Sequence, residues 1–193
     1  MELIPAFEFG LWNAWIFMIV FLIQMSAIMF VDKKTWQRSH VPIEAKKNRY
    51  EKQVGIFANL FWLITMIYSI FLPLQLNSNL FYVGLIVFVI GIIILIRATY
   101  DFMKTKPNSV IKTGVYKISR HPMYLSTFII GLSVSIVSIS WFFLVLCFFM
   151  MFFFQKEALI EERYCQKIFG EEYERYIQHT SRWIGLSKSE VRK

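Results

Sequence analysis

Residues that build common catalytic and structural sites are scarce in this sequence. Its 193 residues include two cysteines, Cys147 and Cys165, which indicate neither a disulfide framework nor a CxxC metal site. The three histidines are isolated, and the chain has no HExxH or HxxxH pair, no GxxxxGK loop and no GxSxG elbow. These absences argue against a zinc protease, a di-iron desaturase, a P-loop nucleotidase and a serine hydrolase. We expect no bound metal.

Basic residues are missing from the start of the chain. The first ten residues, MELIPAFEFG, contain two glutamates and no lysine or arginine. A cleaved secretory signal begins with a basic segment and has a shorter apolar core, so we interpret the first apolar run as a retained membrane span. The net charge is nevertheless +8, and the basic residues lie between apolar runs. Nucleic-acid binders gather such charge on a soluble face, so we expect no nucleic-acid partner.

Long apolar runs are abundant. Hydrophobic residues make up 56% of the chain, which is too apolar for an ordinary soluble domain of this length. A helix needs about 20 apolar residues to cross a bilayer. Such runs lie at about residues 11–31, 54–72 and 80–96, and a longer one at 122–155. The last is too long for one crossing and predicts a tight helical hairpin that turns near Ser133–Ser140, with a second arm ending at Gly170.

These runs predict an all-α, polytopic membrane protein that forms a single domain over residues 1–193. We expect about five transmembrane helices, including the C-terminal hairpin, and a helical tail. Seven Lys and Arg residues follow the first span, six follow the third and eight lie in the tail from Lys156, and together they account for all 21. The positive-inside rule therefore places these segments in the cytoplasm and the N-terminus outside.

Polar clusters stand where the predicted spans reach the cytoplasm. Arg97 follows the third apolar run, and its ordinary role would be to snorkel to the membrane surface. The second cluster, TGVYKISRHPMY, ends at Tyr124. Its Pro122 suits the first turn of a helix. The N-terminus of that helix offers backbone donors to an anion such as a carboxylate, and Arg120 or His121 would add positive charge.

Glu161 and Glu162 form the third cluster, together with the tail FGEEYERYIQHTSRW. Their ordinary interpretation is a solvated helix face paired with nearby basic residues. Adjacent side chains on a helix point about 100° apart, so the two carboxylates do not form a close acid–base pair. One of them could face inward and accept hydrogen bonds from two ribose hydroxyls. The sequence leaves open which one does so.

The ordered set of motifs resembles the integral-membrane methyltransferases, which include isoprenylcysteine carboxyl methyltransferases and phospholipid N-methyltransferases. These enzymes share a Gly-x-Tyr turn, Arg-His-Pro-x-Tyr, a hairpin, paired glutamates, Phe-Gly-x-x-Tyr-x-x-Tyr and a final Arg-Trp or similar pair. The matching residues here are Gly114, Tyr116, Arg120, His121, Pro122, Tyr124, Glu161, Glu162, Phe169, Gly170, Tyr173, Tyr176, Arg182 and Trp183. The resemblance covers about residues 91–183, and the first two spans, within residues 1–79, carry no family motif.

The resemblance implies that S-adenosylmethionine binds at the cytoplasmic surface and that a lipid or lipid-modified acceptor is methylated. It implies catalytic roles for Arg97, Glu161 and Glu162, and acceptor contacts from Arg97, Arg182 and Trp183. It also implies cofactor contacts from Gly114, Tyr116, Arg120, His121, Pro122, Tyr124, Glu161 and Glu162. About sixteen residues separate Arg97 from Gly114. This short connection is similar to that of phospholipid-type and bacterial relatives, so we expect a prokaryotic cell membrane.

A competing hypothesis is a small non-catalytic membrane protein, such as a transporter subunit or an assembly factor, that keeps the same fold. Transporters place polar or ionisable groups near the middle of the bilayer. The few polar side chains within the predicted spans are mainly the amides Asn13, Gln24 and Asn59. Because the polar clusters lie instead at one surface, the sequence favours the enzyme.

Overall fold

The computed structural model describes residues 7–31, 47–106 and 109–185, and within these residues the chain forms helices and no β-strand. This confirms the all-α prediction. The helices are α1 (Trp15–Val31), α3 (Arg49–Ser69), α4 (Asn79–Lys104), α5 (Pro122–Val137), α6 (Trp141–Phe169) and α7 (Glu171–His179). A 3-10 turn, η1 (Gly114–Lys117), lies between α4 and α5.

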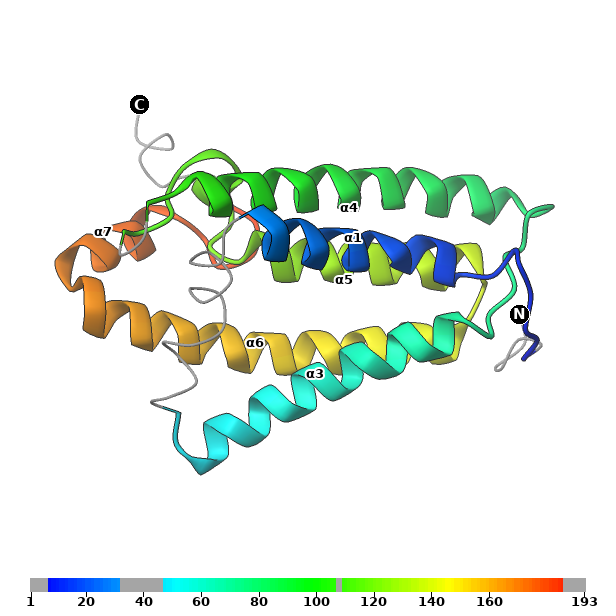
Figure 1. Cartoon of the computed structure of the whole chain (residues 1–193), viewed down its shortest axis with the longest axis horizontal. Helices are drawn as coiled ribbons and strands as arrows, with labels where there is room; N and C mark the ends of the chain where they lie inside the picture. The colour runs from blue at the N-terminus through cyan, green and yellow to red at the C-terminus, as the bar shows by residue number, and fades with distance from the viewer. Residues whose placement is uncertain (1–6, 32–46, 107–108, 186–193) are drawn as a thin grey trace.

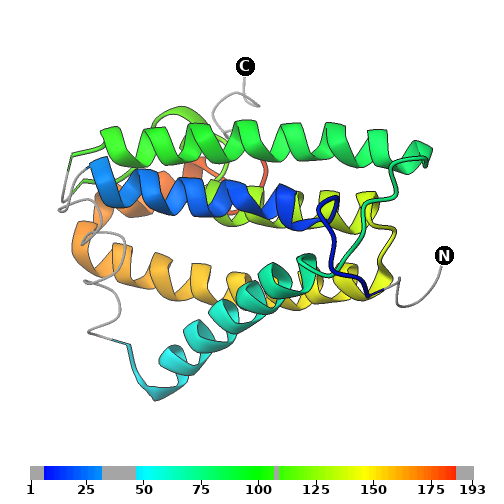
Figure 2. The same cartoon turned by 45° about the vertical axis from the view of Figure 1, so that its right-hand side comes forward.

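Four of the five long helices, α1, α4, α5 and α6, lie along the long axis of the molecule, and α3 is inclined to them (Figure 1, Figure 2). α1, α4 and α6 run in one direction, and α3 and α5 run in the other. α4 packs on α5, α5 on α6 and α3 on α6, while α1 contacts α3, α4 and α5. The short helix α7 lies at one end of the bundle, which we call the α7 end, and the N-terminus lies at the opposite end.

Local capping sets the start of α3. This helix begins at Arg49, about five residues before the predicted apolar run. The side chain of Asn48 accepts a hydrogen bond from the backbone N–H of Glu51, and the Glu51 carboxylate accepts one from the backbone N–H of Asn48. This capping box satisfies backbone donors at the helix N-terminus, so the helix extends into the polar segment.

The first helix begins at Trp15, four residues later than the predicted apolar run. The amide of Asn13 donates hydrogen bonds to the backbone oxygens of Glu8 and Ile70, at 2.6 and 2.7 Å, and Asn13 forms an isolated bridge with Pro73. These contacts join the start of α1 to the end of α3. Asn13 is therefore part of a turn and not of a membrane-spanning helix.

The predicted C-terminal hairpin is confirmed. α5 begins at Pro122 and ends at Val137, and α6 begins after Ser140, whose hydroxyl accepts a hydrogen bond from a backbone N–H of α6. The turn therefore lies within the segment Ser133–Ser140 that the sequence indicated. α6 ends before Gly170, which adopts a φ of +52°. With its ψ of −130°, this is a conformation that glycine adopts readily and other residues rarely do, so glycine suits the end of α6.

Two glycines on α4 allow α5 to pack closely against it. A Cβ atom added at Gly84 would lie 2.5 Å from Cγ1 of Val137, and one at Gly91 would lie 2.7 Å from Cγ1 of Ile130. Seven residues separate the glycines, so they share one face of the helix. Both glycines therefore let the backbones of α4 and α5 approach closely.

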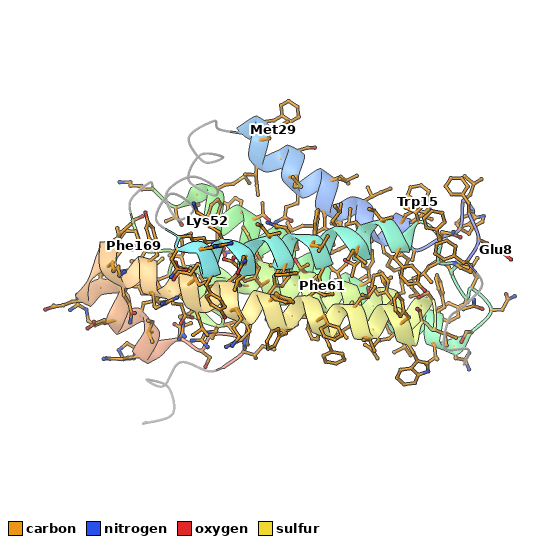
Figure 3. All side chains as sticks on the ribbon, turned by 90° about the horizontal axis from the view of Figure 1, so that it is seen from below. Glu8, Trp15, Met29, Lys52, Phe61 and Phe169 are labelled. Atoms are coloured by element: carbon orange, nitrogen blue, oxygen red, sulfur yellow. The ribbon has the colours of Figure 1, made fainter. Side chains whose placement is uncertain are left out.

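Apolar side chains also cover much of the outer surface. On α4, Ile86, Ile93 and Ile96 are exposed, and Figure 3 shows such side chains projecting along the helices. By length and composition, α4 and α6 could each cross a membrane, and α1 and α5 are shorter apolar helices. These features indicate membrane association, while the arrangement of five crossings stays a prediction.

The described lysines and arginines gather toward one end of the bundle. Lys52 and Phe169 lie toward the α7 end, whereas Glu8 and Trp15 lie at the opposite end (Figure 3). The predicted cytoplasmic segment after α1 lies mostly outside the described residues, as does the end of the tail. The basic residues that the structure describes lie in the parts of the chain that approach the α7 end.

Candidate functional site

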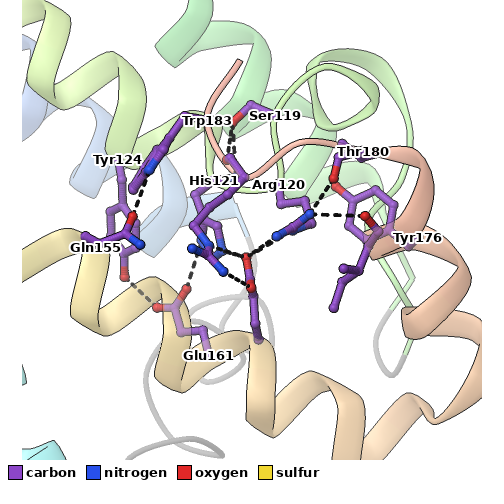
Figure 4. A network of polar contacts seen from close by, with 12 residues as sticks. Ser119, Arg120, His121, Tyr124, Gln155, Glu161, Tyr176, Thr180 and Trp183 are labelled. Atoms are coloured by element: carbon purple, nitrogen blue, oxygen red, sulfur yellow. Dashed lines mark hydrogen bonds and ion pairs between the residues drawn. The ribbon is translucent and has the colours of Figure 1, made fainter. Parts of the chain in front are cut away.

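The candidate site lies where the N-terminus of α5 meets the polar half of α6 (Figure 4). His121 is the N-cap residue of α5, and Pro122 is its first helical residue. Glu161 and Glu162 lie on α6, past the apolar stretch that ends at Phe154. The segment after α7 folds back across both helices, so parts of the chain about 40 and 60 residues apart converge here.

Glu162 is the centre of this site. Its Oε1 accepts hydrogen bonds from Nε of Arg120 at 3.0 Å, from Nε of Arg182 at 2.9 Å and from Nε2 of His121 at 3.1 Å. Oε2 accepts a further bond from Nη2 of Arg182 at 2.8 Å. The Glu162 side chain is 7% exposed. Burial alone would raise the pKa of Glu162, but the hydrogen bonds from His121, Arg182 and Arg120 hold it well below its ordinary range.

His121 bridges the two glutamates. Its Nδ1 lies 3.4 Å from Oε2 of Glu161, and its Nε2 lies 3.1 Å from Oε1 of Glu162. Both ring nitrogens can donate only in the protonated imidazolium. Burial alone would lower the pKa of His121, but the two carboxylates outweigh this effect and raise that pKa above 6.5. The two carboxylates thus contact different nitrogens of the His121 ring, which lies between them.

Glu161 is the more accessible of the two carboxylates. Its side chain is 29% exposed, and it accepts a hydrogen bond from the hydroxyl of Tyr124. The Tyr124 ring stacks on His121, with centroids 5.7 Å apart, and on Phe154, with centroids 4.6 Å apart. Glu161 therefore combines a fixed position with acceptor capacity that solvent or a ligand can reach.

The tail after α7 covers one side of the site. The backbone N–H groups of Arg120 and His121 donate to the backbone oxygens of Ser181 and Arg182, at 3.0 and 3.3 Å. The indole N–H of Trp183 then donates to the side-chain oxygen of Gln155 at 2.8 Å (Figure 4). These contacts fix Arg182 beside Glu162 and place the Trp183 ring near His121.

Arg120 is turned into the protein. Its side chain is 7% exposed, and its Nη1 donates to the backbone oxygens of Ile177 and Thr180 in addition to the contacts with Glu162. Because these acceptors occupy much of the guanidinium, Arg120 is placed to anchor α7 and Glu162. An arginine that binds a cofactor carboxylate would need donors free to face it.

Arg97, Gly114 and Tyr116 lie together around the η1 turn. Nε of Arg97 is 3.4 Å from Oδ2 of Asp101, and the Arg97 side chain is 56% exposed. Gly114 begins η1 with a φ of +57°. The buried Tyr116 accepts a hydrogen bond at its backbone oxygen from the hydroxyl of Tyr176, at 2.6 Å. The RHP and paired-glutamate motifs contact each other directly, whereas the roles predicted for Arg97, Gly114 and Tyr116 stay predictions.

Two buried acids were missed by the sequence interpretation. Asp101 lies beside η1, and it is the one acid among the basic residues of the segment from Arg97 to Arg120. That isolation, together with its position four residues after Arg97, is the signal that could have identified it. The second acid, Glu157, pairs with Lys47 across α6 and the start of α3, at 2.8 Å. Four residues separate Glu157 from Glu161, but no motif marked it.

The site combines a buried cluster of compensated charges with one accessible carboxylate and several aromatic rings. A carboxylate can accept hydrogen bonds from a diol or an amine, and aromatic faces attract flat rings and cations. The arrangement therefore fits a ligand that is both polar and aromatic and that carries positive charge.

One comparison with known proteins bears on these residues. A family model described as phospholipid methyltransferase matches residues 79–172. This stretch begins with the first residue of α4 and ends in the first turn of α7, so it includes the RHP and paired-glutamate motifs. No curated protein matches the chain.

Proposed function

Residues 79–172 of this chain belong to the phospholipid methyltransferase family, and on this premise we propose the following function. The protein transfers a methyl group from S-adenosylmethionine to a lipid or lipid-modified molecule at the cytoplasmic membrane surface. The family implies methyltransferase activity in general. The cofactor, the acceptor and the residue roles given below are the finer parts of the proposal.

One observation carries the proposal. His121 lies within 3.4 Å of both Glu161 and Glu162, although about 40 residues separate the two motifs in the sequence. A buried group of ions has a desolvation cost that an apolar contact of the same size would avoid. The presence of this group beside an accessible carboxylate supports a ligand-binding role over a purely structural one.

The chemistry of the residues fits S-adenosylmethionine. Glu161 would accept hydrogen bonds from the ribose hydroxyls. Trp183 would offer an aromatic face to the adenine or to the positively charged sulfur. Tyr124, whose ring stacks on His121 and Phe154, would border the cofactor through its hydrogen bond to Glu161. Arg97, which is partly exposed, would face the cofactor carboxylate, and the Gly114–Tyr116 turn would border the same region. Glu162, whose oxygens already accept several hydrogen bonds, would hold His121 and the arginines in place.

The bound cofactor supplies an electrophilic methyl group, so the protein's task is mainly alignment. The methyl group would pass from sulfur to an oxygen or nitrogen of the acceptor, with S-adenosylhomocysteine as the leaving group. Such an in-line displacement gains most from fixed positions of the two reactants. We assign no general base. The acceptor would approach from the apolar side of the bundle and the cofactor from water, with Arg182 and Trp183 near the meeting point.

The expected membrane arrangement follows from the charge distribution. We propose that α1, α3, α4, α5 and the apolar part of α6 cross the membrane, with the α7 end in the cytoplasm and the N-terminus outside. α5 has 16 residues and is about 24 Å long. This length is less than the ~30 Å hydrocarbon thickness of a typical bilayer, so His121 would lie at or just below the level of the lipid headgroups.

Isothermal titration of the purified protein with S-adenosylhomocysteine tests the cofactor. We expect saturable binding. No detectable binding at millimolar ligand would contradict the proposal and would favour a non-catalytic membrane protein with the same fold.

Incubation with radiolabelled S-adenosylmethionine tests the acceptor. Separate reactions with total membrane lipids and with prenylated thiols distinguish the two acceptor classes, and we expect label in one of them. Absence of label from both, in a protein that binds S-adenosylhomocysteine, would contradict the lipid acceptor while leaving the cofactor in place.

A further inference from the structure

Asp101 is a buried carboxylate outside the motifs that the sequence indicated. It lies on α4 and is 4% exposed. A buried charge is costly unless hydrogen bonds and opposite charges compensate it. Here Oδ2 of Asp101 accepts a hydrogen bond from the backbone N–H of Val115 at 3.1 Å and lies 3.4 Å from Nε of Arg97. A backbone N–H of η1 and the partly exposed guanidinium of Arg97 together compensate this carboxylate, and of the two only the contact with η1 comes from outside α4.

The turn at Gly114 is shaped around this carboxylate. Gly114 has a φ of +57°, a conformation that other residues rarely adopt. A Cβ atom at this position would lie 1.8 Å from Oδ2 of Asp101. Backbone geometry and close approach therefore both require glycine here. The Gly-x-Tyr turn brings a backbone N–H to Asp101, in addition to any contact it makes with a ligand.

The η1 turn also binds α7. The backbone oxygen of Tyr116 accepts a hydrogen bond from the hydroxyl of Tyr176, at 2.6 Å, and both residues are buried. Burial raises the pKa of Tyr176, so its hydroxyl stays protonated and donates. Tyr176 and Tyr173 also pack with Val110, which precedes η1.

The end of α7 holds the arginines of the site. Backbone oxygens of Ile177 and Thr180 accept hydrogen bonds from Arg120, and the following segment carries Arg182. Both arginines bind Glu162, which binds His121. A continuous series of hydrogen bonds and short peptide segments thus leads from α4 to the centre of the site.

We infer that Asp101 is a positioning residue for the cofactor site, which it supports by fixing η1 and, through η1 and α7, the arginines that hold Glu162. This role rests on the proposed function of that site. Asp101 has no contact with the paired glutamates and acts through other residues. This positioning role explains why an acid outside both motifs is buried, and why position 114 requires glycine.

Two variants of Asp101 separate its acceptor oxygen from its charge. Asp101→Ala removes the acceptor of the Val115 N–H, whereas Asp101→Asn keeps an oxygen in the same place. The matched control is Glu8→Gln, which removes an exposed acid at the opposite end of the bundle. For each purified full-length variant we would measure S-adenosylhomocysteine affinity, the unfolding midpoint, and hydrogen–deuterium exchange without ligand.

For Asp101→Ala we expect faster exchange of amides in residues 114–121 and 171–182, with exchange in α1 and α3 unchanged. We also expect affinity to fall about tenfold, the equivalent of ~1.4 kcal/mol. Asp101→Asn and Glu8→Gln should stay near wild type in both hydrogen–deuterium exchange and S-adenosylhomocysteine affinity. Unchanged exchange in Asp101→Ala, equal losses in Asp101→Ala and Asp101→Asn, or a uniform rise in exchange over all helices would overturn the inference.

Tyr176→Phe tests the hydrogen bond that joins α7 to η1. It also replaces Asp101→Ala as the test if that variant does not fold. It keeps the buried ring and removes the hydroxyl that binds Tyr116. We expect faster exchange in residues 171–182 alone and a smaller loss of affinity. No change in either measurement would contradict the connection. Because exchange is measured without ligand, the expected pattern in a protein that does not bind S-adenosylhomocysteine would support the role of Asp101 and refute the proposed function.

Discussion

The side chains of Glu161 and Glu162 leave α6 one residue apart and meet opposite sides of the His121 ring. Their surroundings give them different tasks. Glu162 is buried and neutralises the cations around it, whereas Glu161 is partly exposed and keeps acceptor capacity. Loss of either would affect the site, but for different physical reasons.

Replacing each glutamate with glutamine separates these reasons. Glu161→Gln should weaken S-adenosylhomocysteine binding by about tenfold, because a charge-assisted hydrogen bond contributes more than a neutral one. Its unfolding midpoint should stay near wild type. Glu162→Gln should instead lower the free energy of unfolding by roughly 3–5 kcal/mol, because it leaves the cations of Arg120, Arg182 and His121 without their counter-ion.

Titration calorimetry and thermal unfolding in the same detergent would measure both effects. The two variants serve as controls for each other, because each makes the same chemical change on the same helix. Wild-type affinity in Glu161→Gln would mean that another group binds the cofactor. Wild-type stability in Glu162→Gln would mean that the buried cluster does not need its central charge.

At the scale of the helices, close packing of α4 on α5 positions the site. α5 begins with the RHP motif, so any shift of α5 moves His121 and Tyr124 relative to α6. The glycines of α4 set this spacing, because a Cβ atom at Gly84 would also lie 3.1 Å from the backbone of Ser133 and Val137. Backbone atoms cannot yield as the end of a flexible side chain can.

We therefore expect Gly84→Ala to destabilise the protein by about 1–3 kcal/mol, the usual effect of overpacking. Ile86→Ala is a suitable control, since it changes an exposed residue on the same helix. Unfolding midpoints in one detergent would compare the two. A Gly84→Ala protein as stable as wild type would show that the interface can relax around an added methyl group.

At the scale of the whole molecule, opposite ends of the bundle have different chemistry. The end with Glu8 has turns and aromatic residues, and the α7 end has the site and the described basic segments. In the proposed membrane arrangement the α7 end borders both water and lipid, so a water-soluble cofactor and an apolar acceptor would meet there. The proposed site of methyl transfer and the proposed membrane orientation thus depend on each other.

Cysteine labelling tests the orientation. In a background with Cys147→Ala and Cys165→Ser, one variant would carry Glu8→Cys and another Glu174→Cys, each at an exposed position. A membrane-impermeant maleimide should label residue 8 in intact cells and residue 174 only after permeabilisation. The reverse pattern would place the α7 end outside. Equal labelling of both in intact cells would mean that the two ends lie on the same side.

Local interactions explain what the sequence by itself determined. Hydrophobic runs predicted the helices, Pro122 and Gly170 marked helix boundaries, and the serine-containing segment before Trp141 predicted the hairpin turn. The resemblance to known membrane methyltransferases, which rests on the residue types of the motifs, implied that His121 and the paired glutamates border one site. Each of these features depends on residues close together in the chain or on residue type, so each could be recognised without coordinates.

Only the tertiary structure decided which side chains of the site are buried, which are accessible and which contact one another. It distinguished buried Glu162 from accessible Glu161, turned Arg120 inward, and placed Asp101 against Gly114. These outcomes depend on the directions of side chains on different helices and on the desolvation that each carboxylate undergoes, and neither can be obtained from spacing along one helix. The contacts that settle them join residues more than ten positions apart.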